Sequence, residues 1–336
     1  MKAVFASELK SVLDTARKEP NPKEDWQAAV FYIGMSADWQ ATGDKDYHAA
    51  LEQWGQSRNW QLAPRPRHAD DMAAGQVYLE LYKREGGPER IAAIRARVDT
   101  FIASSQPGHL DWWWCDAFFM APPVFVKLSA VTGDAHYREV MHPIFWDAIT
   151  RLWDESNHLC YRDKHFKGKV PLVFWARGNG WVLAGLARVL DGLPANDPMR
   201  PRYEELFKTL AASIVKRQGE DGAWRADLLN PQTFPQPESS STAFFAYSLA
   251  WGVNHGLLSR ADYAPAVLKA WAALERAQLP DGNLGSVQPK GDRPAATKPT
   301  DTAPYGAGAF LLLGSELLPS VLISGFITSS LPPVHD

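Results

Sequence analysis

The chain has 336 residues, of which 46% are hydrophobic and 22% are charged, a composition typical of a globular protein with an ample core. Its formal net charge of −3 provides no long-range attraction to nucleic acid or to an anionic membrane surface. No apolar run reaches the length of about 18 residues that a membrane-spanning helix requires, so neither nucleic acid nor a membrane is an expected partner.

The chain begins with an amphipathic segment of mixed charge that lacks an apolar signal core. We therefore expect a cytoplasmic protein, or a periplasmic one if a signal peptide has been trimmed. Cys115 and Cys160 are expected to be buried free thiols, because two isolated cysteines form no disulfide framework. The histidines form neither H-x-x-x-H nor H-E-x-x-H, so no metal cofactor is expected.

Helical periodicity dominates the chain, and strand-like alternation is scarce. Apolar residues recur at helical spacing in the segments 72–82, 124–131, 181–190 and 243–253. Helices that open a pair have expected onsets near residues 26, 70, 118, 176, 242 and 305. The repeated sequence T-G-D-x-x-Y, in 40–51 and 130–141, predicts a helix ended by glycine and an aspartate that starts the next helix.

Six such pairs predict an all-α fold, an (α/α)6 barrel of six helical hairpins that forms one domain over residues 1–336. The structural alternative is an open solenoid of stacked pairs, whose terminal repeats should be polar caps. The last pair begins with the apolar stretch YGAGAFLLLGSELL, which favours closure of the ring. In such a ring, the segments that precede the inner helices gather at one end.

The first of these segments is RPRHADDM, which contains His68 and the adjacent acids Asp70 and Asp71. One acid is expected to cap the helix that starts at Met72, and the other is then available for another role. His68 is a candidate contact to a bound ligand.

The next segment, WWWCDAFFMAPP, places Asp116 inside an apolar run, where a charge is costly unless it is paired, hydrogen-bonded or neutral. Asp116 either caps a helix, or it is a carboxylic acid whose pKa is raised for proton transfer. Trp114 either stacks on a sugar or wedges between neighbouring helices.

The segments YRDKHF and FWARGNGW come before the fourth inner helix. His165 is either a ligand contact or a solvated or capping side chain. Two glycines flank Asn179 and allow a ligand to approach the backbone, while Arg177 suits bidentate recognition of a carboxylate. Alternatively the segment is a helix-entry turn in which Arg177 forms a structural ion pair. Trp175 and Trp181 are the aromatic candidates for substrate contact.

Aromatic side chains interleaved with acids and amides predict a carbohydrate-binding end of the ring. Sugar faces stack on aromatic rings, and sugar hydroxyls require polar partners. No basic stripe accompanies the aromatic residues, which argues against single-stranded nucleic acid.

An ordered set of motifs in this chain resembles the unsaturated rhamnogalacturonyl hydrolases, glycoside hydrolase family 105, which are related to unsaturated glucuronyl hydrolases. The motifs are HADDMAAGQ, WWWCDAFFMAPP, YRDKHF, FWARGNGWV, ESSSTAFFAY and PYGAGAFLL, over roughly residues 26 to 318. The most specific are D-A-x-F-M-A-x-P and W-A-R-G-N-G-W. The resemblance implies an (α/α)6 barrel, in agreement with the hairpin count.

The resemblance also implies a reaction. Such enzymes act on oligosaccharides left by polysaccharide lyases and hydrate the C4=C5 bond of the terminal 4,5-unsaturated uronic acid, without a cofactor. Carried over, Asp116 is the general acid and base, and Asp70 assists it; the distance to Gly75 favours Asp70 over Asp71. Some relatives have a histidine, implicated in substrate contact, in a Y-H-x-W-like stretch where this chain has YRDKHF, so its substrate subclass is expected to differ from theirs. Members of the family act on pectin-derived, ulvan-derived and other unsaturated uronides.

Two other functions stay open on the residues alone. One is a conventional inverting glycosidase, with two carboxylates about 6.5–9.5 Å apart. The other is a carbohydrate-binding protein without catalytic activity. The sequence leaves the leaving-side sugar and the oligomeric state open.

Overall fold

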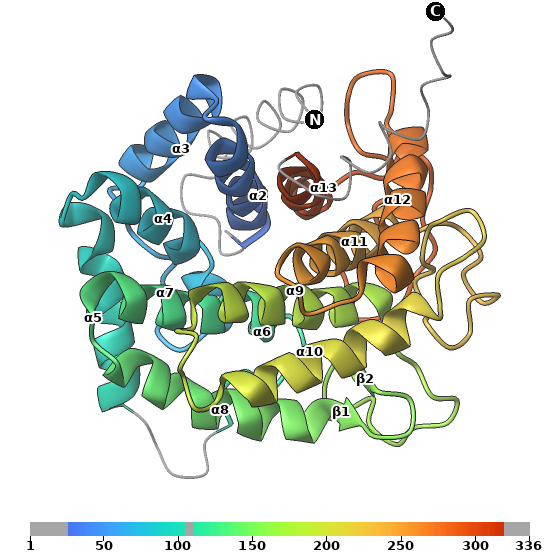
Figure 1. The fold of residues 1–336 in the computed structure, drawn as a ribbon, viewed down its shortest axis with the longest axis horizontal. Coiled ribbons are helices and arrows are strands. Elements are labelled where there is room, and N and C mark those ends of the chain that lie inside the picture. Colours follow the sequence, from blue (N-terminus) through green and yellow to red (C-terminus); the bar gives the residue numbers. More distant parts are fainter. Residues whose placement is uncertain (1–25, 105–109, 319–336) are drawn as a thin grey trace, which may run out of the picture.

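The fold is described from a computed structural model over residues 26–104 and 110–318 (Figure 1). Helices that are buried along most of their length alternate with helices that bury one face. The largely buried, inner helices are α2 (Trp26–Thr42), α4 (Gly75–Glu85), α7 (Pro122–Thr132), α9 (Ala176–Gly192), α11 (Ser239–Asn254) and α13 (Pro304–Leu317). The outer helices are α3 (Lys45–Ser57), α5 (Glu89–Ala103), α8 (His136–Leu152), α10 (Arg200–Val215) and α12 (Arg260–Ala277).

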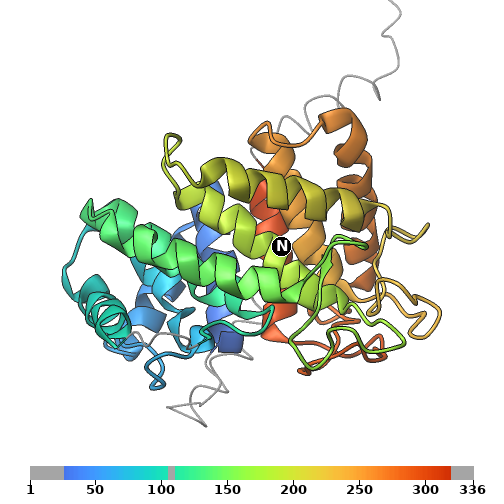
Figure 2. The ribbon, with the colours of Figure 1, turned by 90° about the horizontal axis from the view of Figure 1, so that it is seen from below.

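The inner helices form a closed ring. Each packs against the next along the chain, and α13 returns to pack against α2 (Figure 1). Figure 2 shows the ribbon turned by 90°, with the outer helices α8 and α10 nearest the viewer. The closed ring confirms the barrel and excludes the open solenoid. The outer helix expected after α13 lies outside the described residues.

Two glycines bring the first and last inner helices into backbone contact. A Cβ atom added to Gly34 on α2 would lie 2.1 Å from the carbonyl oxygen of Gly308 on α13. A Cβ atom on Gly308 would lie 2.3 Å from the carbonyl oxygen of Val30. Only glycine fits at these two positions, so the closure of the ring is specified by residues 274 positions apart in the sequence.

Both predicted T-G-D turns form, although only the aspartate of the first one caps the next helix. Gly43 and Gly133 end α2 and α7 with φ of +69° and +74°, a conformation that favours glycine. The Asp44 carboxylate then accepts hydrogen bonds from the backbone N–H groups of Asp46 and Tyr47, which caps α3.

Two inner helices begin differently from the prediction. The helix expected at Met72 begins at Gly75, after a 3-10 turn η1 (Ala69–Met72) that contains both Asp70 and Asp71, and neither acid caps α4. The helix expected near residue 118 is divided into α6 (Ala117–Met120) and α7, which begins at Pro122. Proline lacks the N–H that a continuous helix requires, and it is well tolerated in the first turn.

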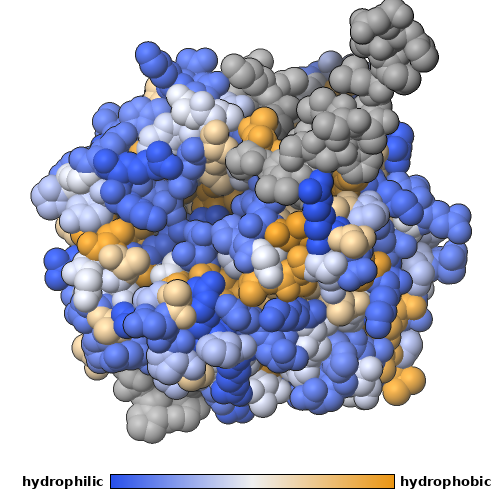
Figure 3. Space-filling view, viewed as in Figure 1, coloured by the Kyte–Doolittle hydropathy of each residue, from blue (hydrophilic) through white to orange (hydrophobic). Residues whose placement is uncertain are grey.

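A short antiparallel pair, β1 (Trp153–Asp154) and β2 (Leu159–Cys160), joins α8 to the loop before α9. Cys115 and Cys160 are buried free thiols, as predicted. The face shown in Figure 3 is predominantly hydrophilic, with a band of hydrophobic residues near its middle. Among the described residues, no helix combines the length and the apolar character needed to cross a membrane.

Candidate active site

A cavity lies at the end of the ring where the inner helices begin. Its volume is about 350 Å³, within the range of roughly 300–1,000 Å³ found for small-molecule sites. Its walls come from the start of α2, from η1, from the segment before α6, and from the loops that follow β2 and precede α13. The lining residues are Trp26, Asp70, Trp114, Asp116, Met120, Arg162, Lys290, Gly291 and Asp292.

Asp116 directly precedes α6, and its side chain makes no capping hydrogen bond, so the capping alternative is wrong. One carboxylate oxygen, Oδ2, accepts a hydrogen bond from the Cys115 thiol at 3.2 Å and lies 3.9 Å from Arg162 Nε. Burial raises the pKa of Asp116 above its ordinary value, although the positive charge of Arg162 opposes the increase. The surroundings therefore favour the protonated form of Asp116, which reduces the cost of placing this acid in an apolar run.

Asp70 reaches the same cavity from η1, and its side chain is 17% exposed. Burial, and next the charge of Asp116, raise the pKa of Asp70 to about 7. One oxygen of Asp70, Oδ1, is buried without a hydrogen-bond partner among the described residues. The cavity therefore holds two acids that both retain protons more strongly than free aspartate.

Asp71 points away from the cavity, although it is adjacent to Asp70 in sequence. Its carboxylate accepts hydrogen bonds from the backbone N–H of Arg65 at 2.7 Å and from the Arg65 guanidinium at 2.5 and 3.0 Å. Asp71 thus holds the loop that leads into η1. The structure brings Asp70, and not Asp71, together with Asp116.

Aromatic residues occupy one side of the cavity. Trp114 lines it, with its ring 4.8 Å from that of His68, which is half-buried and is not among the lining residues. Trp26, at the first position of α2, stacks on Tyr305 at a ring separation of 5.4 Å. Trp26 has no motif around it, so the sequence offered no signal for its place in the cavity.

The WARGNGW segment is buried and supports the cavity wall without lining the cavity. The Arg177 side chain is 1% exposed and donates hydrogen bonds to the carbonyl oxygens of Gln288, at 2.6 Å, and Pro289, at 3.1 Å. The expected ion pair is therefore replaced by bonds to backbone carbonyls. Trp175 donates its indole N–H to the Gln288 side chain at 3.0 Å. Together they hold the loop that carries Lys290, Gly291 and Asp292 into the cavity.

The rest of this segment is also buried. Asn179 bonds the backbone N–H and carbonyl of Cys160, at 2.8 and 3.0 Å, so it fixes the end of β2. Trp181 packs against Phe244, with ring centroids 4.4 Å apart. A Cβ atom on Gly178 would lie 2.7 Å from Cys115 Sγ, so this glycine makes room for the thiol beside Asp116. None of Trp175, Arg177, Asn179 and Trp181 lines the cavity, and their predicted substrate contacts stay predictions without geometric support.

The residue types in YRDKHF pointed to His165, whereas the structure places Arg162 in the cavity wall. Arg162 lies beside Asp116 and donates from Nη1 to Asp163 Oδ2 at 2.6 Å. His165 is instead 66% exposed at its side chain, and it bonds to Asp163 at 3.0 Å outside the cavity wall. The signal available in the sequence was the position of Arg162, a cation directly after the aromatic Tyr161.

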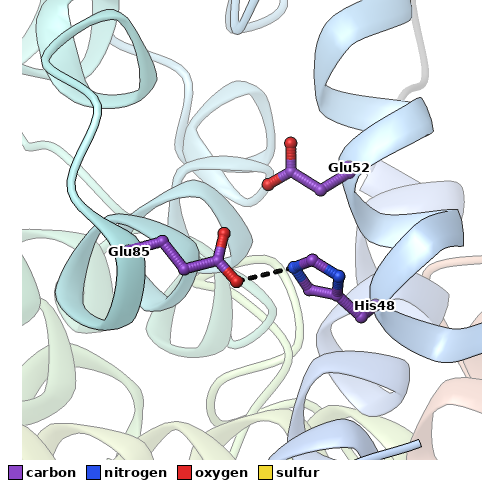
Figure 4. Close-up of side chains that lie close together, drawn as sticks. All are labelled: His48, Glu52 and Glu85. Atoms are coloured by element: carbon purple, nitrogen blue, oxygen red, sulfur yellow. Dashed lines mark ion pairs between the residues drawn. The ribbon is translucent and has the colours of Figure 1, made fainter. Parts of the chain in front are cut away.

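The described residues also form a second hollow and a cluster of titratable side chains. A hollow of about 870 Å³ lies along residues 216–235, but its lining contains no aromatic side chain and its Asp221 is paired with Arg225 at 2.9 Å. On α3 and α4, His48, Glu52 and Glu85 converge (Figure 4). Their carboxylates are already neutralised by Arg90, which lies 2.6 Å from Glu52 and 3.1 Å from Glu85. The two acids in an aromatic cavity remain the candidate active site.

Comparison with known proteins places this site in context. The sequence model of the family described as Glycosyl Hydrolase Family 88 matches residues 2–321. A protein from Formosa agariphila named unsaturated 3S-rhamnoglycuronyl hydrolase is 39% identical over 317 residues, which cover 88% of this chain and 84% of the relative. A protein of the same name from Alteromonas sp. (strain LOR) is 35% identical and covers 92% and 81%. A solved structure described as a family 88 glycosyl hydrolase from Bacteroides vulgatus is similar with a TM-score of 0.83 and 31% identity, over 93% of this chain and 98% of that one.

Proposed function

The chain belongs to Glycosyl Hydrolase Family 88 and removes an unsaturated uronic acid from oligosaccharides, and we propose that it does so by hydrating the C4=C5 bond in the cavity of Asp70 and Asp116. The observation that carries this proposal is the pair of acids. Both have a raised pKa, and both face a cavity with tryptophans in its wall.

Protonation of carbon requires a carboxylic acid that is still protonated near neutral pH. In the proposed reaction, Asp116 transfers its proton to C4, and positive charge develops at C5 and on the ring oxygen. Water then attacks C5 and returns a proton to the Asp116 carboxylate. The resulting hemiketal opens and releases the neighbouring sugar, so that one water molecule is consumed for each bond cleaved.

The substrate class is a finer part of the proposal. Because the relatives from Formosa agariphila and Alteromonas are named for 3S-rhamnoglycuronyl substrates, we propose an unsaturated uronyl group joined to rhamnose. The cavity volume of about 350 Å³ suits one sugar residue with part of its neighbour.

The test is incubation with a panel of lyase-generated unsaturated disaccharides, beginning with rhamnose-linked ones. Loss of the ultraviolet absorbance of the double bond should accompany release of the neighbouring sugar. A conventional inverting glycosidase would release the sugar and leave that absorbance intact, and a binding protein would change neither signal.

Asp116→Asn supplies the matching variant. The amide keeps the shape of the side chain but has no proton to transfer, so kcat should fall by at least roughly 10²–10⁴-fold, the usual contribution of general acid–base catalysis. Thermal unfolding should show a folded protein. Turnover within a few-fold of the parent enzyme would remove Asp116 from the mechanism.

A further inference from the structure

The proposed substrate brings its own negative charge into a cavity that is already lined by three acids, Asp70, Asp116 and Asp292. We propose that Arg162 binds the carboxylate of the unsaturated uronate through the Nε–Nη2 edge of its guanidinium. This inference rests on the proposed function and identifies the residue that recognises the anionic part of the substrate.

The backbone fixes Arg162 beside the reacting acid. The N–H of Cys115 donates a hydrogen bond to the carbonyl oxygen of Arg162 at 2.8 Å, and Trp114 and Asp163 form an isolated bridge across the same two segments. Arg162 therefore runs alongside the residues that precede Asp116. A substrate held by its side chain would lie within reach of that acid.

The side chain of Arg162 is held in place at one edge. Nη1 donates to the carboxylate of Asp163, which is 3% exposed and also accepts the backbone N–H of His165 at 2.7 Å. Its Cζ lies 5.5 Å from the centre of the Trp113 ring. Little side-chain freedom remains to be lost when a ligand binds.

The opposite edge of the guanidinium, formed by Nε and Nη2, makes no hydrogen bond among the described residues. Nε is buried and has no hydrogen-bond partner among the described residues, and the Asp116 oxygen at 3.9 Å is beyond hydrogen-bonding distance. A buried donor without a partner is costly. A carboxylate supplies two oxygens that match the Nε–Nη2 fork, so ligand binding would satisfy this donor.

The other nearby cations are less suited to this role. Both terminal nitrogens of Arg177 already bond to backbone carbonyls, and Arg177 does not line the cavity. Lys290 lines the cavity and adds positive charge, but an ammonium group lacks the planar fork.

The experiment compares an unsaturated disaccharide as the free acid with the same disaccharide as its uronate methyl ester, which has no charge. The parent enzyme should prefer the acid in kcat/KM. Arg162→Gln should lower kcat/KM for the acid by about ten- to a hundredfold, the range of a hydrogen bond to a charged group, and change the ester far less. The preference for the acid should therefore collapse. The acid preference of Arg162→Lys should lie between those of the parent enzyme and Arg162→Gln, because lysine keeps the charge and loses the planar fork.

Arg151→Gln is the control for loss of one positive charge. Arg151 lies on the exposed outer side of α8 in an ion pair with Asp147, so this variant should keep the preference of the parent enzyme. The ratio of acid to ester within each variant cancels any change that Arg162 causes in the acidity of Asp116.

A second measurement does not depend on the folding of the Arg162 variants. The Asp116→Asn protein retains Arg162 and should bind the free acid more tightly than the ester in calorimetry. Equal affinity there, or an unchanged preference in Arg162→Gln, would overturn the carboxylate contact. Absence of double-bond loss with any substrate in the panel would overturn the proposed function instead, so the two failures are distinguishable.

Discussion

Asp70 and Asp116 show how one cavity raises the pKa of two carboxyl groups to which different neighbours contribute. Burial is the largest cause for both, but only Asp70 has the neighbouring acid as the next cause. Asp116 is partly compensated by Arg162 and by the thiol of Cys115. Arg162 and Cys115 can stabilise the charged form of Asp116. Asp116 is therefore the residue that we propose alternates between acid and carboxylate during turnover.

The raised pKa of Asp70 makes a prediction about stability. With a folded-state pKa of about 7 against 3.8 in the reference state, the folded protein retains a proton that the unfolded chain has released between these values. Stability therefore falls as pH rises from about 4 to 7, and the penalty is complete above that range. Asp70→Asn removes it, so the gain in melting temperature over the parent should be smallest near pH 4 and largest at pH 8. The expected gain in the free energy of unfolding at pH 8 is a few kcal/mol at most, because each unit between the two pKa values corresponds to about 1.4 kcal/mol.

Asp292 provides the control, since it lines the same cavity and has the opposite shift. The hydrogen bond from Arg293 lowers the pKa of Asp292, so its contribution is present above the unfolded-state pKa and is lost as pH falls. Asp292→Asn should not stabilise the protein at pH 8. An equal gain for Asp70→Asn at pH 4 and pH 8 would show that its carboxyl group is not held protonated by the fold.

At the scale of single elements, the WARGNGW segment marks the limit of what its residue types can predict. Aromatic rings and an arginine suit a bound uronate, and they equally suit the backbone of a loop. The partners of Arg177 are carbonyls about 110 residues later in the chain, in a loop without a motif of its own. No residue near Arg177 in the sequence distinguishes a contact with a bound uronate from a contact with a loop backbone. By contrast, the T-G-D turns were predictable because glycine and aspartate act within a few residues of themselves.

Arg177→Lys tests the scaffolding role of this element. Lysine has one ammonium group where arginine bonds two carbonyl oxygens from separate nitrogens, so at least one of these charge-assisted hydrogen bonds is lost, at a cost of about 1.5–3 kcal/mol. The melting temperature should fall, while the preference for acid over ester, measured as above, should be retained. Arg151→Lys, on the exposed side of α8, should change the melting temperature little. A loss of the acid preference without a loss of stability would restore the predicted contact between Arg177 and the substrate.

At the scale of the whole molecule, the order of helix onsets predicted the ring because each inner helix is marked by its own apolar run. Asp70, Asp116 and Trp114 could be placed at one end, since each lies a few residues before the start of an inner helix, α4 or α7. Trp26 and the loop at Lys290 could not be placed there from the sequence. Their positions depend on how α13 packs against α2 and on the path of the loop before α13. The sequence also could not show that Asp71 turns toward Arg65, since adjacent acids in a 3-10 turn point in different directions.

Closure of the ring is the feature on which both the fold and the cavity depend. In Gly308→Ala, the new methyl group would lie 2.3 Å from the Val30 carbonyl oxygen, and only a shift of backbone between α13 and α2 can relieve the overlap. We expect a loss of stability of at least the roughly 1–3 kcal/mol typical of overpacked cores. Because Trp26 on α2 stacks on Tyr305 of α13, separating the helices should also displace the cavity wall and raise KM.

Gly75→Ala is the matched control for this prediction. Gly75 also lies in an inner helix, but its added methyl group would meet a side-chain atom of Val124 at 3.3 Å, and alanine is the better helix former by about 1 kcal/mol. Its melting temperature should therefore change much less than that of Gly308→Ala. If the two variants unfold at the same temperature, the seam between α2 and α13 is not a special constraint, and the ring tolerates a wider closure than the two glycines imply.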